Sequence, residues 1–442
     1  MNHVRLKNNR SVISGKTVIG IDPAKDRHRA AVVDAHGNQI GNSFSFSTNH
    51  AGYTYKLWEN VAKLIGEASP ENVVFAVETA CNLWETISFY LHSHGYTVLL
   101  VSPLSTRHSR PVMSLEFSRT DPKDAYLIAT VAQRGAFQLY ESFTPESNAM
   151  HSLGITYDKL RKALAQNRAR VRAMLDRFFP EFPKIMTPST NSAVYLLKKY
   201  LYPDEFLAMD IDSEEKVIEK ISRKQYGRKT LEMLQESAKK TVGVKRQADE
   251  RIADRIALDA YLAMIETAEK HMERVLDELI SRAKKRPEFE RISSLSGVGD
   301  LLTALFLAEV RDLSRYKHYK HIEKLAGYNL RLHDSGRFSG VRHISSLGNH
   351  RLRWILFKMT EESSKRVAEI RLKYLRRQIK RRGHTKNVVA VVSKLLQLIM
   401  AMEKEQRPYE VRDTFVKELQ ELEKQYEKIK KNKRSKKIKH VA

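Results

Sequence analysis

A series of short apolar segments near the N-terminus constrains the fold of this 442-residue chain more than any other feature. Three strand-like runs come first and in succession, TVIGID, RAAVVD and NSFSFS, each β-branched or alternating in polarity. Helical and strand-like segments then alternate: a helix at 57–64, the strand NVVFAVE, a helix at 83–94, the strand YTVLLVS and a helix at 121–136. This order predicts antiparallel strands followed by parallel strands that are joined through helical crossovers.

The same order of elements is that of the ribonuclease-H-like fold, so we expect an α/β domain of that kind over residues 1–145. No convincing sheet is predicted from about 145 onward, and the rest of the chain is expected to be all-α. The expected parts are a helical linker region at 146–246, a coiled-coil dimerisation helix at 247–289, a helical C-terminal domain at 290–403 and a basic tail at 404–442. The lysine-rich end of that tail is expected to be disordered without a partner.

An apolar seam supports the long helix in the middle of the chain. Its members recur at alternating steps of three and four residues: Leu258, Tyr261, Ile265, Ala268, Met272, Val275 and Leu279. This spacing is typical of a coiled coil, and burial of one helix against its own domain explains it equally well.

Charge divides the chain into two parts. The 78 Lys and Arg against 52 Asp and Glu give a net charge of +26. The first 140 residues hold 14 of the basic and 11 of the acidic residues, so nearly the whole excess lies in the remainder. Such an excess indicates a polyanionic partner, and simple solubility is the weaker explanation.

Other features exclude several classes of protein. Cys81 is the only cysteine, which removes disulfides and cysteine-based zinc sites, and the histidines lack metal-binding spacing. No apolar run approaches the ~18 residues of a membrane span, and the basic N-terminus is not followed by a signal sequence. We therefore expect a cytoplasmic, nucleoid-associated protein of a bacterium or archaeon, without a membrane partner.

Four carboxylates fall at suggestive places in the nearly neutral first part. Asp22 ends the first strand, Glu78 ends the fourth, and Asp121 and Asp124 share one face of the following helix. In the predicted sheet the first and fourth strands are neighbours, so these side chains would converge at one edge. Oxygen ligands select Mg²⁺ or Mn²⁺, and two such ions can flank a scissile phosphate. Taken singly, Asp121 is explained as a helix N-cap and Asp22 as a turn former.

A second group of candidate residues surrounds Ser335, which precedes a glycine in a predicted polar loop. The arginines that flank it are Arg331, Arg337, Arg342, Arg351 and Arg353. Arginines can stabilise a phosphate under attack by a serine hydroxyl, although spacing alone favours a Ser-Gly turn in a DNA-binding loop. Upstream, Gly297 and Gly299 open a helix whose backbone N–H groups could bind a phosphate.

Two groups of motifs, one near each end of the chain, occur together in one known family. The first group is VIGIDPAKDRH, AVETACNLWETISFYLHSHGYTVLLVSP and SRTDPKDAYLIA. The second is LSGVGDLLTALFLAEVRD, KLAGYN, HDSGRF and ISSLGNHRLRWIL. In this order they resemble the DEDD-type transposases of the insertion sequence 110 (IS110) family. The sequence departs from the usual family residues at Ser102, Arg119 and Asn329, none of them a proposed catalytic position.

The resemblance implies a RuvC-like domain in which Asp22, Glu78, Asp121 and Asp124 bind Mg²⁺. It also implies that Ser335 attacks DNA and forms a covalent phosphoserine intermediate. Family members are recombinases in which a structured non-coding RNA from the element bridges donor and target DNA. The resemblance further implies a dimer or tetramer, held by the coiled-coil helices, in which domains from different protomers form one active site.

We therefore expect a transposase that cleaves and rejoins DNA under RNA guidance. One alternative is a RuvC-like junction endonuclease or DNA invertase that uses the carboxylates without RNA. The other is a non-catalytic nucleic-acid-binding protein whose acidic residues are structural. Co-purification of a specific RNA separates the first hypothesis from the second, and metal-dependent activity separates both from the third.

Overall fold

The computed structural model divides the chain into two compact units, Met1–Phe143 and Thr144–Ala442. It describes residues 3–80, 82–113, 121–331, 334–335, 338–339, 343–345, 347–380, 383–411 and 414–439. Within these ranges the side chains of 3–7, 111–113, 121–122, 331, 334–335, 338–339, 414, 416 and 431–439 are outside the description. An α/β first unit and a mostly helical second unit are as the sequence predicts.

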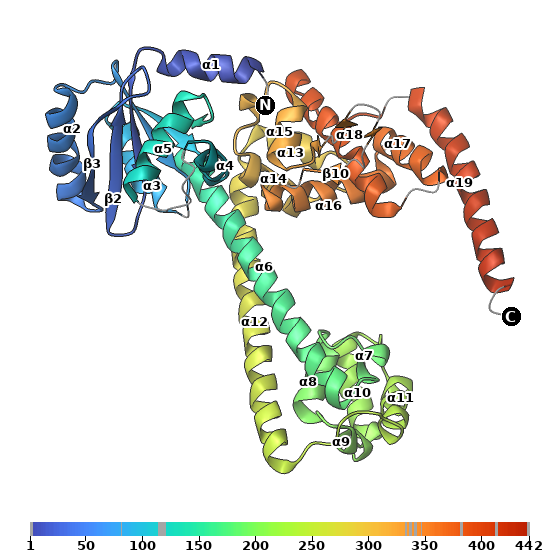
Figure 1. Ribbon diagram of the computed structural model, residues 1–442. Helices are drawn as coiled ribbons and strands as arrows, with labels where there is room; N and C mark the ends of the chain where they lie inside the picture. The colour runs from blue at the N-terminus through green and yellow to red at the C-terminus, as the bar shows by residue number, and fades with distance from the viewer. Residues whose placement is uncertain are drawn as a thin grey trace. The chain divides into compact units, whose positions relative to one another are not determined.

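The first unit is built on a six-stranded mixed sheet with the strand order β3-β2-β1-β4-β5-β6 (Figure 1). The strands are β1 (Thr17–Asp22), β2 (Arg27–Val33), β3 (Gln39–Ser47), β4 (Val73–Glu78), β5 (Thr97–Val101) and β6 (Gln138–Leu139). β1 pairs antiparallel with β2 and parallel with β4, and β4 pairs parallel with β5. The predicted neighbourhood of the first and fourth strands is therefore present.

Helices cover both faces of this sheet because each strand alternates its side chains between two cores. The helices are α1 (His3–Ile13), α2 (Leu57–Ile65), α3 (Trp84–Ser93), α4 (Pro103–Met113) and α5 (Asp121–Gln133), and a π-helical turn, Gly52–Lys56, leads into α2. Ile19 and Ile21 of β1 lie in the core with residues of α2 and α3. Val18 lies in the opposite core, with residues of α5.

Gly20 allows α5 to lie directly on β1. A Cβ atom at Gly20 would lie 2.2 Å from the carbonyl oxygen of Ala125 and 2.7 Å from the nitrogen of Ala129. Any larger residue would force the helix away from the strand. Three further elements, α1, α4 and β6, are not predicted from the sequence.

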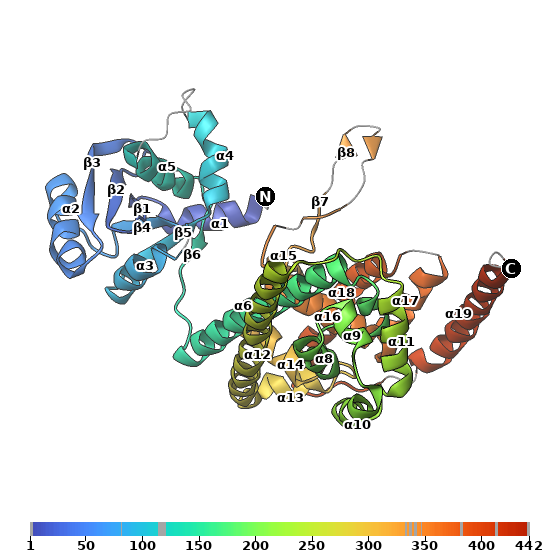
Figure 2. The same cartoon turned by 90° about the horizontal axis from the view of Figure 1, so that it is seen from below.

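The second unit begins with two long helices that pack antiparallel, α6 (Pro145–Phe178) and α12 (Ala248–Lys284) (Figures 1 and 2). Between them in sequence lie α7 (Phe182–Ile185), α8 (Asn191–Lys199), α9 (Pro203–Leu207), α10 (Ile211–Ser222) and α11 (Arg228–Lys239). These short helices form a distal core with the far ends of α6 and α12. Thr144 caps the start of α6, where its side chain accepts a hydrogen bond from the backbone of Ser147.

The apolar seam of α12 is used inside the chain. Leu258, Ile265 and Ala268 are buried in the distal core. Leu279 is buried in a second core, which lies among the helices after α12 and which we call the C-terminal core. Met272 is partly buried against both cores. Since α6 of the same chain supplies the packing partner, burial of this seam needs no second chain. The spacing of the seam had two explanations, a coiled coil between chains and burial within the chain. The structure shows burial within the chain.

The remaining helices form the C-terminal core. They are α13 (Pro287–Ser293), α14 (Asp300–Val310), α15 (Tyr319–Leu325), α16 (His350–Arg366), α17 (Ala368–Ile379), α18 (His384–Glu405) and α19 (Thr414–Lys439), with a 3₁₀ turn at Leu313–Arg315. By length and composition α18 could cross a membrane, but Val391, Leu395 and Ile399 place its apolar side in this core.

The expectation that the lysine-rich end of the chain is disordered is wrong for residues 424–439, which belong to α19. Leu419, Leu422 and Tyr426 pack against the C-terminal core. Their spacing of three and four residues supplies an apolar stripe within the charged sequence, and that stripe is what docks the helix.

Candidate active site

Two of the predicted acidic residues lie at the ends of neighbouring strands, at the same edge of the sheet. β1 and β4 pair in parallel with Ile21 opposite Val77, and the next residues along the strands are Asp22 and Glu78. The carboxyl ends of parallel strands meet at the same edge, so the topology brings these two residues together, which the sequence order predicted.

The direction of α5 brings the backbone of the other two acidic residues, Asp121 and Asp124, to this edge. At the far end of the helix, Gln133 donates a hydrogen bond to the carbonyl oxygen of Asp34, 2.6 Å away. Asp34 follows β2, which runs antiparallel to β1, so that end of α5 lies beside the start of β1. The first turn of α5, with Asp121 and Asp124, therefore lies beside the end of β1. The backbone of Asp121 is described, and its side chain is not.

Two residues that the sequence did not indicate hold carboxylates at this edge. Thr106 is buried and donates a hydrogen bond of 2.5 Å from Oγ1 to Oε1 of Glu78. Arg110 pairs with Asp124 at 2.5 Å, and each side chain is about a quarter exposed, 27% and 25%. Both lie on α4 and are four residues apart, hence on one helix face. Pro103 at the start of α4 was the available signal, since proline favours the first turn of a helix.

The loop after Asp22 is held by a buried histidine on β2. Nδ1 of His28 accepts a hydrogen bond from the backbone N–H of Ala24 (3.1 Å), and Nε2 lies 2.7 Å from the hydroxyl of Tyr53. Because a backbone N–H can only donate, the neutral ring carries its proton on Nε2. Burial lowers the pKa of His28 to about 4, so the ring stays neutral at physiological pH.

The described carboxylates at this edge are oxygen donors, the kind of ligand that Mg²⁺ or Mn²⁺ prefers. Asp22, Glu78 and Asp124 are three such donors on adjacent elements. Among the side chains that the structure describes, no three acidic, histidine or cysteine residues are close enough to form a metal site. The residues present fit a hard cation by chemistry, and Arg110 supplies positive charge to Asp124.

Ser335 lies in a β-hairpin and not in a loop, contrary to the sequence prediction. β7 (Leu330–Arg331) pairs with β10 (His343–Ile344), and β8 (Asp334–Ser335) pairs with β9 (Phe338–Ser339). We call the four strands β7 to β10 the serine hairpin, and Figure 2 shows β8 beyond the helices of its unit. The strands have two residues each, too short for periodicity to reveal them. Among the predicted arginines, Arg331 is described by its backbone, whereas Arg337 and Arg342 lie outside the described residues.

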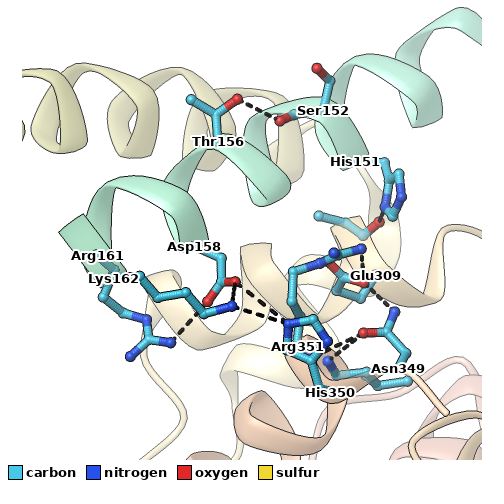
Figure 3. A network of polar contacts seen from close by, with 12 residues as sticks. His151, Ser152, Thr156, Asp158, Arg161, Lys162, Glu309, Asn349, His350 and Arg351 are labelled. Atoms are coloured by element: carbon cyan, nitrogen blue, oxygen red, sulfur yellow. Dashed lines mark hydrogen bonds and ion pairs between the residues drawn. The ribbon is translucent and has the colours of Figure 1, made fainter. Parts of the chain in front are cut away.

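One buried carboxylate fixes the helix that follows the serine hairpin (Figure 3). The side chain of Glu309, on α14, is 1% exposed and accepts two hydrogen bonds from Arg351, of 2.6 and 3.3 Å. It also accepts from the side-chain amide of Asn349. Asn349 in turn caps α16 by accepting from the backbone N–H groups of Arg351 and Leu352. The guanidinium of Arg351 is thus paired within the protein.

A second ionic group joins α6 to the same helix. Asp158 pairs with Lys162 at 2.7 Å and with Arg161 at 2.8 Å, and Nζ of Lys162 lies 3.1 Å from Nε2 of His350 (Figure 3). Burial opposes ionisation of Asp158, but the hydrogen bonds from Lys162 and Arg161 outweigh it and lower the pKa. Arg161 also lies over the ring of Trp354 at 4.3 Å.

The base of the serine hairpin is tied to α16 through Arg353. Its Nε donates a hydrogen bond of 2.8 Å to the carbonyl oxygen of Ala326, and its own carbonyl accepts one of 2.8 Å from the hydroxyl of Tyr328. Burial raises the pKa of Tyr328, which therefore remains a hydrogen-bond donor. The short segment between α15 and β7 is held in place by these contacts.

The two glycines before α14 differ in role. Gly297 has a φ of +93°, and a Cβ atom there would lie 2.9 Å from the carbonyl oxygen of Glu362 on α16. Its conformation and its close approach to a helix backbone both require glycine. Gly299 is the N-cap of α14, with open space around its Cα.

Comparison with known proteins gives matches at both ends of the chain. Residues 19–180 match a family model of DEDD-type IS110 proteins, described as "Transposase". Residues 289–375 match one described as "Transposase IS116/IS110/IS902 family". The chain is 24% identical over 411 residues to the "Insertion element IS116 uncharacterized 44.8 kDa protein" of Streptomyces clavuligerus, covering 88% of this chain and 95% of that protein. It is 22% identical over 409 residues to the "Transposase for insertion sequence element IS1111A" of Coxiella burnetii, covering 89% and 91%.

Proposed function

We propose that this chain, a transposase with an IS110-type domain near each end, cleaves and rejoins DNA with a RuvC-like set of carboxylates and a serine nucleophile. One observation carries the proposal: Asp22, Glu78 and Asp124 come from neighbouring elements to one edge of a mixed sheet. Together with Asp121 they are oxygen donors for a divalent cation.

The residues of the sheet edge would hold Mg²⁺ or Mn²⁺. When bound, the metal would stabilise negative charge on the attacking and leaving oxygens of a phosphodiester. Thr106 fixes one oxygen of Glu78, and Arg110 restrains Asp124, so both carboxylates are oriented before substrate binds. Such orientation lowers the entropy lost on reaching the transition state.

In the proposed reaction the Oγ of Ser335 attacks a DNA phosphorus, forming an O–P bond and breaking the bond to one sugar oxygen. The serine proton leaves to a base, and the departing strand takes a proton on its hydroxyl. Attack of a hydroxyl from another strand on the phosphoserine then restores Ser335 and joins the strands. The number of phosphodiester bonds is conserved, so no external energy source is needed.

We propose that an element-encoded RNA selects donor and target sequences and that the protein acts as a homo-oligomer. The excess of basic residues after residue 140 supports contact with phosphate backbones in place of base-specific reading. Self-association is supported by α12, whose Ile252 and Ile256 are 60% and 66% exposed on one face. Donor and target DNA are the expected substrates.

The serine is tested by covalent capture. Ser335→Ala should abolish both the protein–DNA adduct in denaturing gels and recombination, with Ser339→Ala from the same hairpin as the matched control. Asp22→Asn should abolish both while retaining the circular dichroism spectrum. An adduct that survives in Ser335→Ala would refute the role of the serine.

The proposed role of the RNA is tested by purifying the protein from cells that also transcribe the non-coding DNA beside its gene. A specific RNA that co-purifies, and that recombination requires, is the expected result. Activity without any such RNA would favour the junction endonuclease or invertase. Binding without metal-dependent cleavage, unchanged in Asp22→Asn, would favour a non-catalytic protein.

A further inference from the structure

Three cationic side chains come together between two helices that take no part in the serine hairpin. α17 and α18 form an antiparallel pair, shown by hydrogen bonds from Lys373 to Ser393 (3.3 Å) and from Asn387 to Gln378 (2.5 Å). Arg377 lies one turn after Lys373 on the same face of α17. Lys394 is next to Ser393 on α18.

Two of these cations, Arg377 and Lys394, lack the ion-pair partners that similar residues have elsewhere in the described part of the unit. Lys373, Arg377 and Lys394 are all half-buried. The Nε of Arg377 is buried without a hydrogen-bond acceptor, and among the described side chains neither Arg377 nor Lys394 has an ion-pair partner. By contrast, Arg371 of the same helix pairs with Glu423 at 3.0 Å, and Arg291 pairs with Glu403 at 2.7 Å.

Mutual repulsion acts on this group. Burial lowers the pKa of Lys373, and the charges of Lys394 and Arg377 lower it further. Glu323 on α15 is the opposing carboxylate, and its charge acts against this lowering. Burial raises the pKa of Glu323 itself, while the charges of Lys320 and Lys373 lower it. Like charges held together in a half-buried place are unfavourable unless an anion joins them.

We propose that Lys373, Arg377 and Lys394 bind one phosphate group of a nucleic-acid backbone. Arg377 offers the forked N–H donors that suit a phosphate, and the lysines add charge on either side. The inference rests on the proposed function, which supplies the phosphodiester ligand. The site would position the nucleic acid and would carry no sequence information.

The test uses the full-length chain with Arg377→Gln/Lys394→Gln and measures equilibrium binding to two probes, a duplex DNA of about 30 base pairs and an RNA hairpin of about 30 nucleotides. The pair Lys324→Gln/Lys404→Gln removes the same charge from exposed positions on α15 and α18 and is the matched control. We expect binding of one probe to weaken about tenfold at 0.1 M salt in the test variant and less than about twofold in the control. The salt slope should fall by about one.

Which probe is affected identifies the source of the phosphate as DNA or RNA. The unfolding midpoint of the test variant should stay unchanged or rise, because removing like charges relieves repulsion. Equal losses in test and control variants would overturn the site in favour of diffuse charge. A lowered midpoint would overturn it in favour of a structural role, and wild-type protein that binds neither probe would overturn the proposed function as well.

Discussion

At the residue scale, the local geometry beside the proposed chemistry depends on side chains buried next to it. His28 holds the loop after Asp22, and Glu309 holds the helix after the serine hairpin. Neither residue is a candidate for touching DNA. Each fixes the backbone next to a residue or segment that is proposed to contact DNA. Buried side chains of this kind orient reactive groups before the substrate binds.

His28 should make folding stability depend on pH. The folded protein keeps the ring neutral down to a pKa of about 4, whereas the unfolded chain takes up a proton below about 6.5. Stability should therefore fall as the pH drops from about 6.5 to 4, by about 2 kcal/mol between pH 7 and 5. Urea unfolding of wild type and His28→Asn, which keeps an acceptor for Ala24, measures this at both values. An equal pH dependence in the two proteins would contradict the assignment.

Removal of the Glu309 side chain should lower the stability of the folded protein. Glu309→Ala leaves Arg351 half-buried without its counter-charge and frees the amide of Asn349, so we expect a loss of about 3–5 kcal/mol in the free energy of unfolding. The exposed pair of Lys365 and Glu362 is the comparison, and Lys365→Gln should change stability by less than about 0.5 kcal/mol. Comparable losses in both variants would show that Glu309 has no special role.

At the element scale, α12 presents two apolar faces with different uses. Leu258 is 2% exposed in the distal core, while Ile256, two residues earlier, is 66% exposed. The face of Leu258 packs within the chain, and the face of Ile256 is available to another copy.

Substitution of each face should therefore have a different effect. Leu258→Ser should lower the unfolding free energy by about 2–5 kcal/mol, because it creates a cavity and buries a hydroxyl. Ile256→Ser should leave stability nearly unchanged and shift light-scattering mass toward the monomer. A mass that is unchanged by Ile256→Ser would remove this face from the proposed oligomer.

The elements that the sequence predicted and those that it missed differ in length and surroundings. Strands β1, β2, β4 and β5 are apolar runs that are buried on both faces of the sheet. Helices α5 and α12 have apolar residues at helical spacing because one side of each is buried. The strands of the serine hairpin have two residues each, too few to show a period, and α4 (PLSTRHSRPVM) has few apolar residues to mark it. The sequence predicts a basic tail where α19 lies, because the many charges obscure a narrow apolar stripe.

At the scale of the whole molecule, the division of charge follows the division into units. The first 140 residues are nearly neutral and the rest carries a net charge of +23. Carboxylates at the sheet edge account for part of the neutrality of the first unit, and the second unit holds the surplus cations such as Arg377 and Lys394.

Binding of duplex DNA should therefore depend steeply on salt. With several phosphates contacted, affinity should fall by about a thousandfold or more from about 50 to 200 mM salt, since counterions are released on binding. Titration by fluorescence anisotropy at several salt concentrations measures the slope. Asp22→Asn/Asp124→Asn should leave the slope unchanged, because these residues belong to the proposed metal edge. A nearly flat affinity would contradict backbone contact.

The amino-acid sequence predicts most strands and helices of the first unit in their order along the chain, the placement of Asp22 and Glu78 at strand ends, and the long helix with its apolar seam. These follow from local periodicity, which a chain shows whatever its tertiary structure. The packing of α6 against the seam, the contacts of Thr106 and Arg110 with the carboxylates, and the hold of Glu309 on α16 become visible in the folded chain alone. Such pairings join residues from separate elements, often far apart in sequence, so they depend on packing that no local pattern records.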